Sequence, residues 1–580
     1  MPGQPRHRPQ RRFPEAERRI IECDLDTCVH CGQPLHPRKW WHMRKTVQTL
    51  QGPTFVAGKS KECANPDCLH AGLHYYASRV LLISLPRSTY GLDVLAFIGW
   101  QHEHGHQQLV EIQRELNRRG VVVNERNVGK LYRQFLALLG GLTERKRQRL
   151  EAAVEQFGGL VWAIDALEPE GHGTMLYVLY EVLSETPVGA IQLDHPTADE
   201  LVAWLQPYQA LPFPVLATLS DGEGAILAAF RTCWPGVPPQ RCQSHWLGNI
   251  ADPVLKVDTQ LREQMRQDLG GLPAVPEQVQ APAGVISVEP PRLATPIVAP
   301  PFLPAPRDAQ LIEIETQMRS AIRDAVNRPS RKPFHWGGLT GYQQLEGIAL
   351  ALHSVAPEAE TAYLCRLSMQ VDRAVDQNRP LAQDVAGAHL WLTRIADGLR
   401  YPPSSFPASG LLGGPVSSDQ VRAEMEDLLQ QFHPDLKRQP AQAALYSAWH
   451  RLWKTCGSDL LPCYDIPGLP PDNLKLEALF EGLRCHQRRI SGRKSTRPLR
   501  DFGQYQVLFD AQSQAELLQQ LQQTSEVDYQ AQRRRLAKAE EPRQLFSRLH
   551  RDPAATARRL VDQHATRRVE LARATAALPP

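Results

Sequence analysis

The stretch that decides the fold is residues 160–193, LVWAIDALEPEGHGTMLYVLYEVLSETPVGAIQL. Three runs rich in apolar residues, 160–165, 175–183 and 186–193, are separated by the turn-forming segments EPEGHGT and SET. Short apolar runs bounded by such turns are typical of strands, so this stretch predicts three consecutive strands. The first run ends in a carboxylate, Asp165, where an apolar residue would be expected.

The next sixty residues alternate between helix and strand signals. A helix is predicted from Pro196 to Tyr208, which starts with a capping signal, and a strand from Pro214 to Ser220. A second helix from Gly222 to Cys233 and a short strand from Pro239 to Trp246 complete the pattern. The order βββαβαβ predicts a mixed α/β sheet, and a second acid, Asp221, directly follows its fourth strand.

Asp165 and Asp221 each end an otherwise apolar strand. Burial of an ionised carboxylate is costly unless another group compensates its charge, and a metal ion does so. Oxygen ligands suit Mg²⁺, and two such ions can activate a nucleophile and stabilise a leaving oxygen in phosphodiester chemistry. Each acid taken alone is equally compatible with a strand-end turn or a helix cap, and Asp221-Gly222 fits both.

Two cysteine pairs near the N-terminus, Cys28-x-x-Cys31 and Cys63-x4-Cys68, have the spacing of zinc ligands. Each pair can lie on a tight turn, and two turns can close a tetrahedron of thiolates around Zn²⁺. The alternative is a set of four unrelated buried thiols. Other potential ligands nearby leave the ligand set open, namely Cys23, His30, His36, His42, His70 and His74.

A helix-turn-helix is predicted within residues 88–141. The helix from Gln107 to Arg119 is followed by Gly120, and the helix from Glu125 to Leu139 has Asn124 as its N-cap. Both helices carry an apolar face, and a second helix presented in this way can enter a major groove. An ordinary helical hairpin is the alternative. The outward side chains of the second helix, which we expect to contact DNA, are Arg126, Asn127, Lys130 and Arg133.

The chain of 580 residues is too long for one core, and its composition changes along its length. Ten prolines between residues 273 and 306 predict a tether inside a helical insertion. The predicted organisation is a disordered basic tail at 1–20, a zinc-ribbon-like domain at 21–80, the helix-turn-helix domain at 88–141, the first part of the catalytic core at 155–253, the helical insertion at 254–460, the last part of the core at 461–500 and a C-terminal helical region at 501–580.

Bulk properties narrow the function classes only slightly. The net charge is +4, although Arg and Lys are concentrated in the first 45 residues and after Arg484. Local basic patches can bind phosphate even when the whole chain is nearly neutral. No apolar run approaches the ~20 residues needed to cross a bilayer, so no membrane partner is expected. The expected location is the cytoplasm, in association with the nucleoid.

Three blocks of the sequence resemble the DDE transposases of bacterial insertion sequences and of the Mutator-like elements. The blocks are residues 160–193, residues 219–250, LSDGEGAILAAFRTCWPGVPPQRCQSHWLGNI, and residues 472–494, DNLKLEALFEGLRCHQRRISGRK. The resemblance implies a ribonuclease H-like core interrupted by a large all-α insertion. It also implies that Cys242 and His245 form the family's Cys-x-x-His signature near the site.

The same resemblance implies that Glu477 is the third acid, with Glu481 as its main rival and Glu346 as a weaker one. The sequence departs from the family pattern at Asp472 and Leu474, where Thr and Asn are usual. Helical periodicity independently places Glu477 on a face with arginines, which bind phosphate well. The basic residues expected to contact DNA there are Arg484, Arg488, Arg489, Arg493 and Lys494.

The predicted function is therefore DNA transposition by a metal-dependent enzyme. Asp165, Asp221 and Glu477 are expected to hold two Mg²⁺ or Mn²⁺ ions that serve both cleavage and strand transfer, while the cysteines hold a structural Zn²⁺. Expected partners are double-stranded DNA, as terminal inverted repeats and as target, and a second copy of the chain, because two ends must be paired. The alternatives are an inactive domesticated transposase that acts as a DNA-binding regulator and a nuclease without strand transfer.

Overall fold

The computed structural model describes residues 13–141, 144–167, 174–270, 306–359, 362–402, 416–491 and 503–576. This part of the chain divides into two compact units. The first unit contains residues up to Thr218, Glu223–Val237 and the chain from Leu474 onward, and the second contains Leu219–Gly222 and Pro238–Asn473. Most of the proline-rich segment predicted at 273–306 lies outside the described residues, as does the tail before Phe13.

A small sheet built from two long strands carries the cysteines. Strand β2 (His36–Thr49) pairs antiparallel with β3 (Gly52–Glu62), and β3 also pairs with the short β4 (His74–Tyr75). Strand β1 (Glu17–Ile21) pairs parallel with β3. The prediction that the disordered tail extends to residue 20 is therefore wrong. The exposed sequence ERRI has no apolar alternation, and only its backbone pairing with β3 makes it a strand.

Three helices follow the small sheet and confirm the predicted helical segment. They are α1 (Leu92–Glu103), α2 (Leu109–Arg118) and α3 (Glu125–Leu139). The Asn124 side chain accepts a hydrogen bond from the Asn127 N–H at 2.9 Å, which caps α3 as its sequence predicts. Gly120 has a φ of +80°, a conformation that glycine adopts without strain in the turn between α2 and α3.

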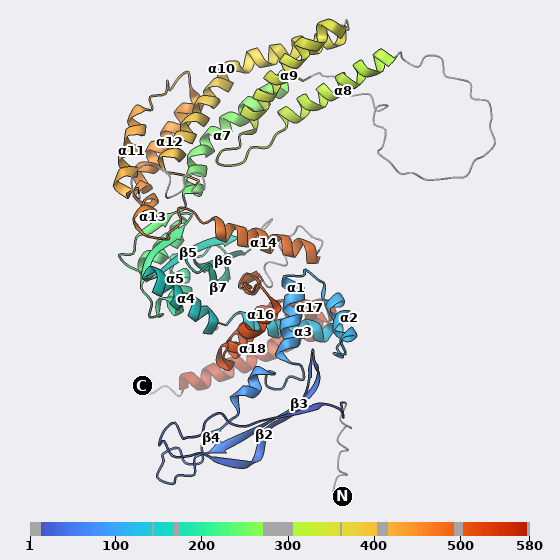
Figure 1. Ribbon diagram of the computed structural model, residues 1–580, viewed down its shortest axis with the longest axis vertical. Coiled ribbons are helices and arrows are strands. Elements are labelled where there is room, and N and C mark those ends of the chain that lie inside the picture. Colours follow the sequence, from blue (N-terminus) through green and yellow to red (C-terminus); the bar gives the residue numbers. More distant parts are fainter. Residues whose placement is uncertain are drawn as a thin grey trace, which may run out of the picture. The chain divides into compact units, whose positions relative to one another are not determined.

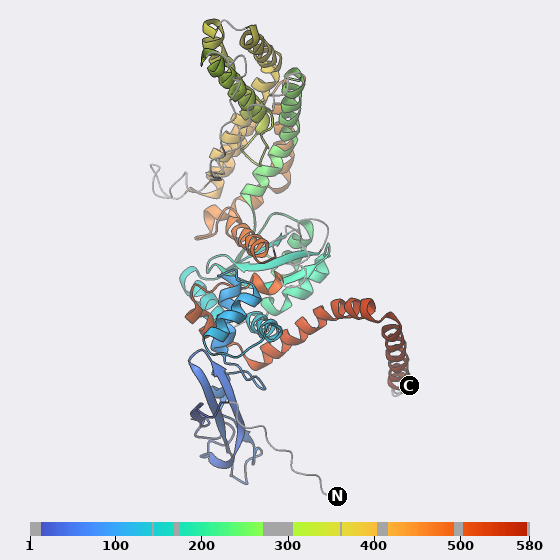
Figure 2. The same ribbon diagram turned by 90° about the vertical axis from the view of Figure 1, so that its right-hand side faces the viewer.

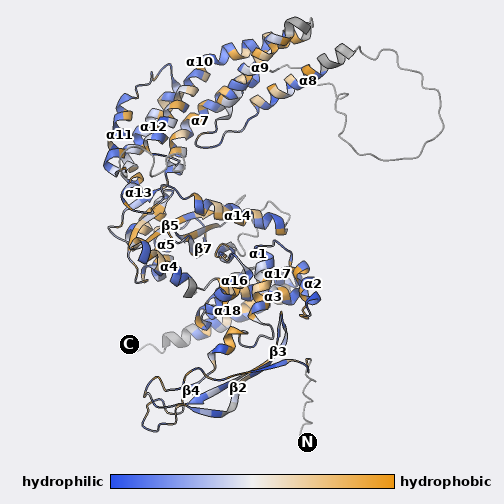
Figure 3. Ribbon diagram, in the orientation of Figure 1, coloured by the Kyte–Doolittle hydropathy of each residue, from blue (hydrophilic) through white to orange (hydrophobic). Residues whose placement is uncertain are grey.

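The central sheet has five strands in the order β7-β6-β5-β8-β9. They are β5 (Leu160–Leu167), β6 (Met175–Glu181), β7 (Thr186–Leu193), β8 (Val215–Ser220) and β9 (Pro239–Arg241). With α5 (Ala198–Gln209) and α6 (Gly224–Cys233), they confirm the predicted order βββαβαβ. Figure 1 shows β5, β6 and β7 side by side, and Figure 3 shows how hydrophobic β5 is.

One face of β5, β6 and β7 packs against helices of the same unit. Trp162 and Ile164 lie in a core with side chains of α5, α6 and α4 (Glu144–Phe157), a helix that was not predicted from the sequence. Side chains alternate along a strand, so Asp165 points to the opposite face from Trp162 and Ile164. The apolar face thus holds the strand, while Asp165 is displayed on the other side of the sheet.

The second unit is helical beyond its sheet residues, as the sequence predicts. A single apolar core joins six helices, which Figure 1 shows running beside one another. They are α7 (Gln243–Asp268), α8 (Pro306–Val326), α9 (Gly337–Ala359), α10 (Ala362–Gly398), α11 (Ser418–Gln431) and α12 (Pro440–Cys456). The chain then passes through Gly457–Leu460 and α13 (Pro462–Asp465) to the end of the unit.

The chain returns to the first unit at α14 (Leu474–Ser491), and α16 (Gln514–Gln523), α17 (Glu526–Arg551) and α18 (Pro553–Ala576) follow. The Thr524 hydroxyl donates to the Leu138 carbonyl at 3.1 Å, so the C-terminal region packs against α3. Figure 2 shows α17 and α18 as long helices near the C-terminus, and α18 is exposed over most of its length. No described helix is long and apolar enough to cross a membrane.

A buried carboxylate ties α7 to α9 in the helical unit. Asp258 is fully buried and accepts hydrogen bonds from the N–H groups of Gly338 and Leu339, at 2.9 and 2.7 Å. It also accepts one from the Ser330 hydroxyl at 2.9 Å. The first N–H groups of a helix have no partner within it, and a negative charge there also interacts favourably with the helix dipole.

We expect Asp258→Asn to destabilise α9 by about 2–3 kcal/mol, because the amide loses the charge and offers one acceptor atom in place of two. The measurement is hydrogen–deuterium exchange of the amides of α9 in the full chain. Asp252→Asn is the matched control, since Asp252 pairs with Lys332 at a half-exposed position and its loss should cost less than about 0.5 kcal/mol. Equal exchange in the two variants would contradict the capping role of Asp258.

Candidate functional site

The four paired cysteines meet in space. The sulfur atoms of Cys28, Cys31, Cys63 and Cys68 all lie within 4.8 Å of one another, and three of the four residues are buried. Cys31 Sγ lies 3.7 Å from Cys63 Sγ. Four sulfurs at about 2.3 Å from a tetrahedral Zn²⁺ are separated by about 3.8 Å. The cluster is consistent with a zinc site, and the predicted pairing is confirmed.

Two backbone hydrogen bonds position the segments that carry these thiols. The Gly32 N–H donates to the Cys28 carbonyl at 2.9 Å, and the Gly72 N–H donates to the Cys63 carbonyl at 2.8 Å. The Tyr75 hydroxyl lies 3.2 Å from Cys28 Sγ and lowers the pKa of that thiol to about 5. This hydrogen bond favours the thiolate, which is the form that binds metal.

The alternative ligands are not part of the four-thiol cluster. Cys23 is buried against the cluster but contributes no atom to it. His30 and His70 are exposed and stack on each other, with ring centroids 3.6 Å apart. The His74 ring nitrogens lie 2.7 and 3.0 Å from an Arg38 nitrogen. Sequence spacing alone could not separate these histidines from the ligands, because all of them lie within the same sixty residues.

Asp165 lies on β5 near the edge where that strand ends. It is 8% exposed, and its Oδ1 accepts a hydrogen bond from the Ala166 N–H at 2.8 Å. The Leu160 N–H donates to the Pro214 carbonyl at 2.8 Å, so β5 and the neighbouring β8 begin at the same edge and run in the same direction. Parallel neighbours also end at the same edge, and Asp221 directly follows β8.

Asp221 occupies a strand-end turn. Helix α6 begins at Gly224 with Glu223 as its N-cap, so the helix-cap interpretation of Asp221 is wrong. Gly222 has a φ of +99°, and a Cβ built on it would lie 2.1 Å from Arg241 Nη1. The Arg241 guanidinium therefore packs directly on the turn that follows β8. Arg241 was not among the residues predicted from the sequence, and only the absence of a side chain at Gly222 hints at this packing.

The Cys-x-x-His pair lies at the start of a helix in the second unit. The prediction of a strand to Trp246 is wrong, because β9 ends at Arg241 and α7 begins at Gln243. The helix forms because Trp246, Ile250 and Val254 are spaced to bury one helical face. His245 Nδ1 lies 3.3 Å from Cys242 Sγ, and the Cys242 N–H donates to the carbonyl of Ser220, the residue before Asp221, at 2.8 Å.

The segment just before α14 contacts the start of α7, where the Cys-x-x-His pair lies. Within the second unit, the Gln243 N–H donates to the Pro471 carbonyl at 2.8 Å. Helix α14 begins three residues later at Leu474, and Glu477 lies in its first turn. Asp165 and Glu477 belong to the first unit and Asp221 to the second, so the meeting of all three carboxylates stays a prediction.

Helix α14 is amphipathic in the way its sequence predicts. Leu476, Phe480 and Leu483 are buried, whereas Glu477 is half-buried and Arg488 and Arg489 are exposed. The two rivals for the third acid have ion-pair partners: Glu481 lies 3.9 Å from Arg488, and Glu346 lies on α9 at 3.7 Å from Arg379. Arg493 and Lys494, predicted to contact DNA, lie outside the described residues.

The side chains predicted to reach DNA from α3 are accessible. Arg126, Lys130 and Arg133 are exposed and Asn127 is half-buried, while Val128, Leu131, Phe135 and Leu138 on the other face are buried. This arrangement presents three cations along one side of α3. It satisfies the accessibility that a recognition helix requires.

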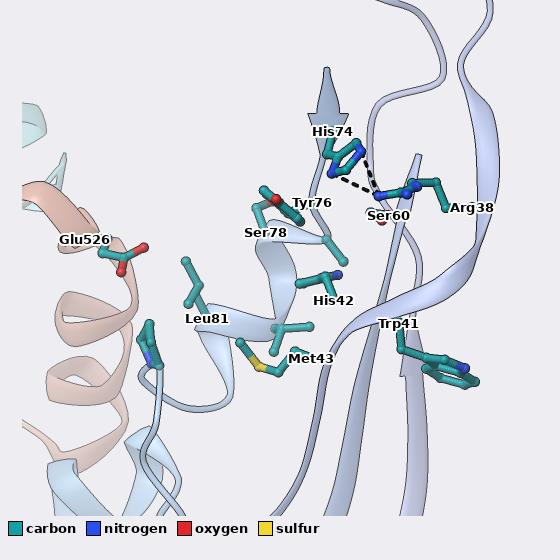
Figure 4. Close-up of a pocket in the computed structure, with 13 residues that line it drawn as sticks. Arg38, Trp41, His42, Met43, Ser60, His74, Tyr76, Ser78, Leu81 and Glu526 are labelled. Carbon is teal, nitrogen blue, oxygen red and sulfur yellow. Dashed lines mark hydrogen bonds between the residues drawn. The ribbon is translucent and has the colours of Figure 1, made fainter. Parts of the chain in front are cut away.

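A cavity of about 640 Å³ lies between the cysteine-bearing sheet and the C-terminal helices. Figure 4 shows that Trp41, His42 and His74 line it, with Glu526 of α17 on its far side. Burial lowers the pKa of His42, which favours its neutral form. Of the residues predicted to act in catalysis or to bind metal, only the alternative zinc ligands His42 and His74 line this cavity, and no pattern in the sequence predicted it.

No family model matches this chain, and no curated protein matches it. Among solved structures, the chain is similar to one described as a Drosophila P element transposase strand transfer complex, at 10% sequence identity and a TM-score of 0.33. The alignment covers 76% of this chain and 94% of that chain. A likeness at this TM-score supports no conclusion about this chain, whose fold and site rest on the residues described above.

We expect Cys63→Ser to lower the zinc content of the full chain by one ion, because a tetrahedral site with three thiolates binds zinc far more weakly. Elemental analysis by mass spectrometry after dialysis provides the measurement. Cys23→Ser is the matched control, since this buried cysteine lies against the cluster without joining it. Loss of the same ion from Cys23→Ser, or its retention in Cys63→Ser, would contradict the assignment.

Proposed function

We propose that this protein is a DNA transposase that cleaves and joins DNA at Asp165, Asp221 and Glu477 on a ribonuclease H-like core. The observation that carries the proposal is the parallel pairing of β5 with β8, which brings the end of each strand to one edge of the sheet. Asp165 is near the end of the first strand and Asp221 follows the second. The resemblance of the surrounding sequence blocks to DDE transposases supports the same function.

The three residues suit divalent magnesium or manganese. All three offer carboxylate oxygens, the ligand type that hard cations prefer, and Asp165 lies in an apolar strand where its charge needs compensation. Two bound ions would supply an activated nucleophile and stabilise the leaving oxygen at the scissile phosphodiester. Asp165 is held in place by its strand and by the Ala166 N–H, so the sheet itself orients this ligand.

Cationic side chains near the acids would bind the DNA backbone. Arg241 packs on the turn after Asp221, and Arg488 and Arg489 are exposed on the helix that carries Glu477. Guanidinium groups bind phosphate through paired hydrogen bonds. These arginines would hold the scissile strand while the carboxylates hold the metal ions.

Recognition of the transposon ends would fall to the N-terminal part of the chain. The exposed cations of α3 would enter the major groove, and the cysteine-rich sheet beside them would add contacts to the backbone. The partner is double-stranded DNA, both as terminal inverted repeats and as target. At least two copies of the chain would act together, because a transposition event pairs two ends.

We expect Asp165→Asn to abolish Mg²⁺-dependent cleavage of a duplex that carries a transposon end, because the amide binds the cation weakly. Binding of the duplex should stay within about twofold of the wild type, since DNA recognition lies elsewhere. The measurements are gel-resolved cleavage and strand-transfer products together with a binding titration. A wild-type chain that cleaves a duplex but does not join a pre-nicked end to target would instead be a nuclease.

Asp194→Asn is the matched control for this experiment. Asp194 follows β7, which runs in the same direction as β5 and therefore ends at the same edge of the sheet, but its side chain is 75% exposed. Its substitution should leave cleavage unchanged. Cleavage by Asp165→Asn at the wild-type rate would overturn the proposed function, and a wild-type chain that binds DNA without cutting it would identify a regulator.

Replacement of both Lys130 and Arg133 by Ala should weaken binding to the end-bearing duplex. It should also reduce the magnitude of the slope of log K against log salt concentration by about 2. Each phosphate contact contributes about 1 to that slope, and both side chains are exposed on α3. Fluorescence anisotropy at a series of salt concentrations gives both quantities. A double substitution of Lys437 and Arg438 by Ala makes the same change in net charge on an exposed loop, and an equal effect there would refute a specific role for α3.

A further inference from the structure

A second group of ligand-type side chains is buried in the first unit, apart from the cysteines. His102 and Glu103 lie at the end of α1, and His486 lies on α14. One nitrogen or oxygen atom from each lies within 4.8 Å of the others. All three residues are buried, with 7%, 8% and 4% of their surfaces exposed. No residue of this group was singled out by the sequence analysis, although HEHGH at 102–106 is a His-rich tract of the kind that binds metals.

The hydrogen bonds of His102 leave one ring nitrogen ready to bind a cation. Its Nδ1 lies 2.8 Å from the backbone carbonyl oxygen of Gln107, which can only accept, so Nδ1 carries the proton. With the proton on Nδ1, the neutral ring has its lone pair on Nε2. Metal-binding histidines characteristically donate their other N–H to a carbonyl or carboxylate in this way.

His486 also presents a lone pair toward the cluster. The side-chain amide nitrogen of Gln506 lies 3.3 Å from His486 Nε2 and can only donate, so Nε2 is an acceptor. The proton of His486 is then on Nδ1, which lies 2.9 Å from His106 Nδ1. His486 Nε2 lies 3.2 Å from Glu103 Oε2, another acceptor when the carboxyl group is ionised. Two facing acceptors need a proton or a cation to hold them together.

The carboxylate of Glu103 is oriented by neighbours on its other oxygen. Oε1 accepts a hydrogen bond from the Tyr132 hydroxyl, and the Gln506 amide lies 3.0 Å from that hydroxyl. Oε2 is therefore the oxygen directed at His486 and available to a ligand. A separation of 3.2 Å between this oxygen and His486 Nε2 is close to the edge of about 3.4 Å between ligands bound at about 2.1 Å in a tetrahedral site.

We infer that His102, Glu103 and His486 form a second divalent transition-metal site, for which Zn²⁺ is the expected ion. Two imidazoles and one carboxylate are donors that Zn²⁺ accepts, and the set differs from the four thiolates near the N-terminus. A bound cation would keep Glu103 ionised, although burial, partly offset by the hydrogen bonds of Tyr132 and Gln506, raises its pKa to about 8. The site would join α1, which packs beside the proposed recognition helix α3, to α14. Glu477 lies on α14 nine residues before His486.

The competing arrangement has no metal. In it, Glu103 is protonated and donates a hydrogen bond to His486 Nε2, so that the cluster is a neutral network. This network satisfies the same distances, and metal content distinguishes it from a bound ion. A count of bound ions in the full chain, together with a spectroscopic measurement of the ligand type, separates the two arrangements.

The first measurement is zinc per chain after loading with Zn²⁺ and dialysis, determined by elemental mass spectrometry in an Asp165→Asn background that removes one carboxylate of the proposed catalytic site. We expect two ions in this parent chain and one in each of the Cys63→Ser, Glu103→Gln and His486→Gln variants. His104→Gln is the matched control, because His104 is exposed one residue beyond α1 and stacks on Trp100. It should retain two ions.

A substituted chain that misfolds would also lose its metal. A second measurement therefore leaves His102, Glu103 and His486 unchanged. The Cys63→Ser chain is titrated with Co²⁺, whose visible absorption reports bound nitrogen and oxygen ligands without the strong charge-transfer bands of thiolates. We expect one equivalent to bind, and Zn²⁺ to displace it. One zinc ion per parent chain that disappears entirely with Cys63→Ser, or an absence of Co²⁺ absorption in that chain, would overturn the inference and leave the proposed transposase function untouched.

Discussion

The pairing of β5 with β8 is the interaction on which the candidate catalytic site depends. These strands are separated in the sequence by β6, β7 and α5, and their hydrogen bonds align the two strand starts at one edge. The apolar face of β5 is held by Trp162 and Ile164 against the helices, so Asp165 is directed to the opposite face. Buried apolar packing therefore supplies the free energy that holds a carboxylate in an otherwise unfavourable position.

The large helical unit interrupts the chain between the fourth strand and α14, and its own two ends lie close together. The hydrogen bond from Gln243 to Pro471 joins the start of the insertion to its end. The closure of a long insertion costs little more chain entropy than the closure of a short one, since the cost grows only with the logarithm of length. More than two hundred residues can therefore intervene between Asp221 and Glu477 while Pro471, near the end of the insertion, still lies beside the Cys-x-x-His pair.

The C-terminal region has a structural role that was not evident before the fold was known. The bond from Thr524 to Leu138 and the contact between Gln506 and Tyr132 attach residues after α14 to α3. Helix α18, in contrast, is exposed along most of its length. The C-terminal region thus combines a segment that packs on α3 with a helix, α18, whose surface is exposed.

The sequence by itself determined the local elements and indicated a cluster of paired cysteines, because both depend on short-range patterns. Apolar runs and turns defined β5, β6 and β7, Asn124 capped α3, and the spacing of Cys28, Cys31, Cys63 and Cys68 identified the thiol cluster. Tertiary structure alone decided that residues 17–21 form a strand, that Arg241 packs on Gly222, and that His486 meets His102 and Glu103. Such contacts join residues far apart along the chain, and their energies depend on burial and partner geometry that no local pattern encodes.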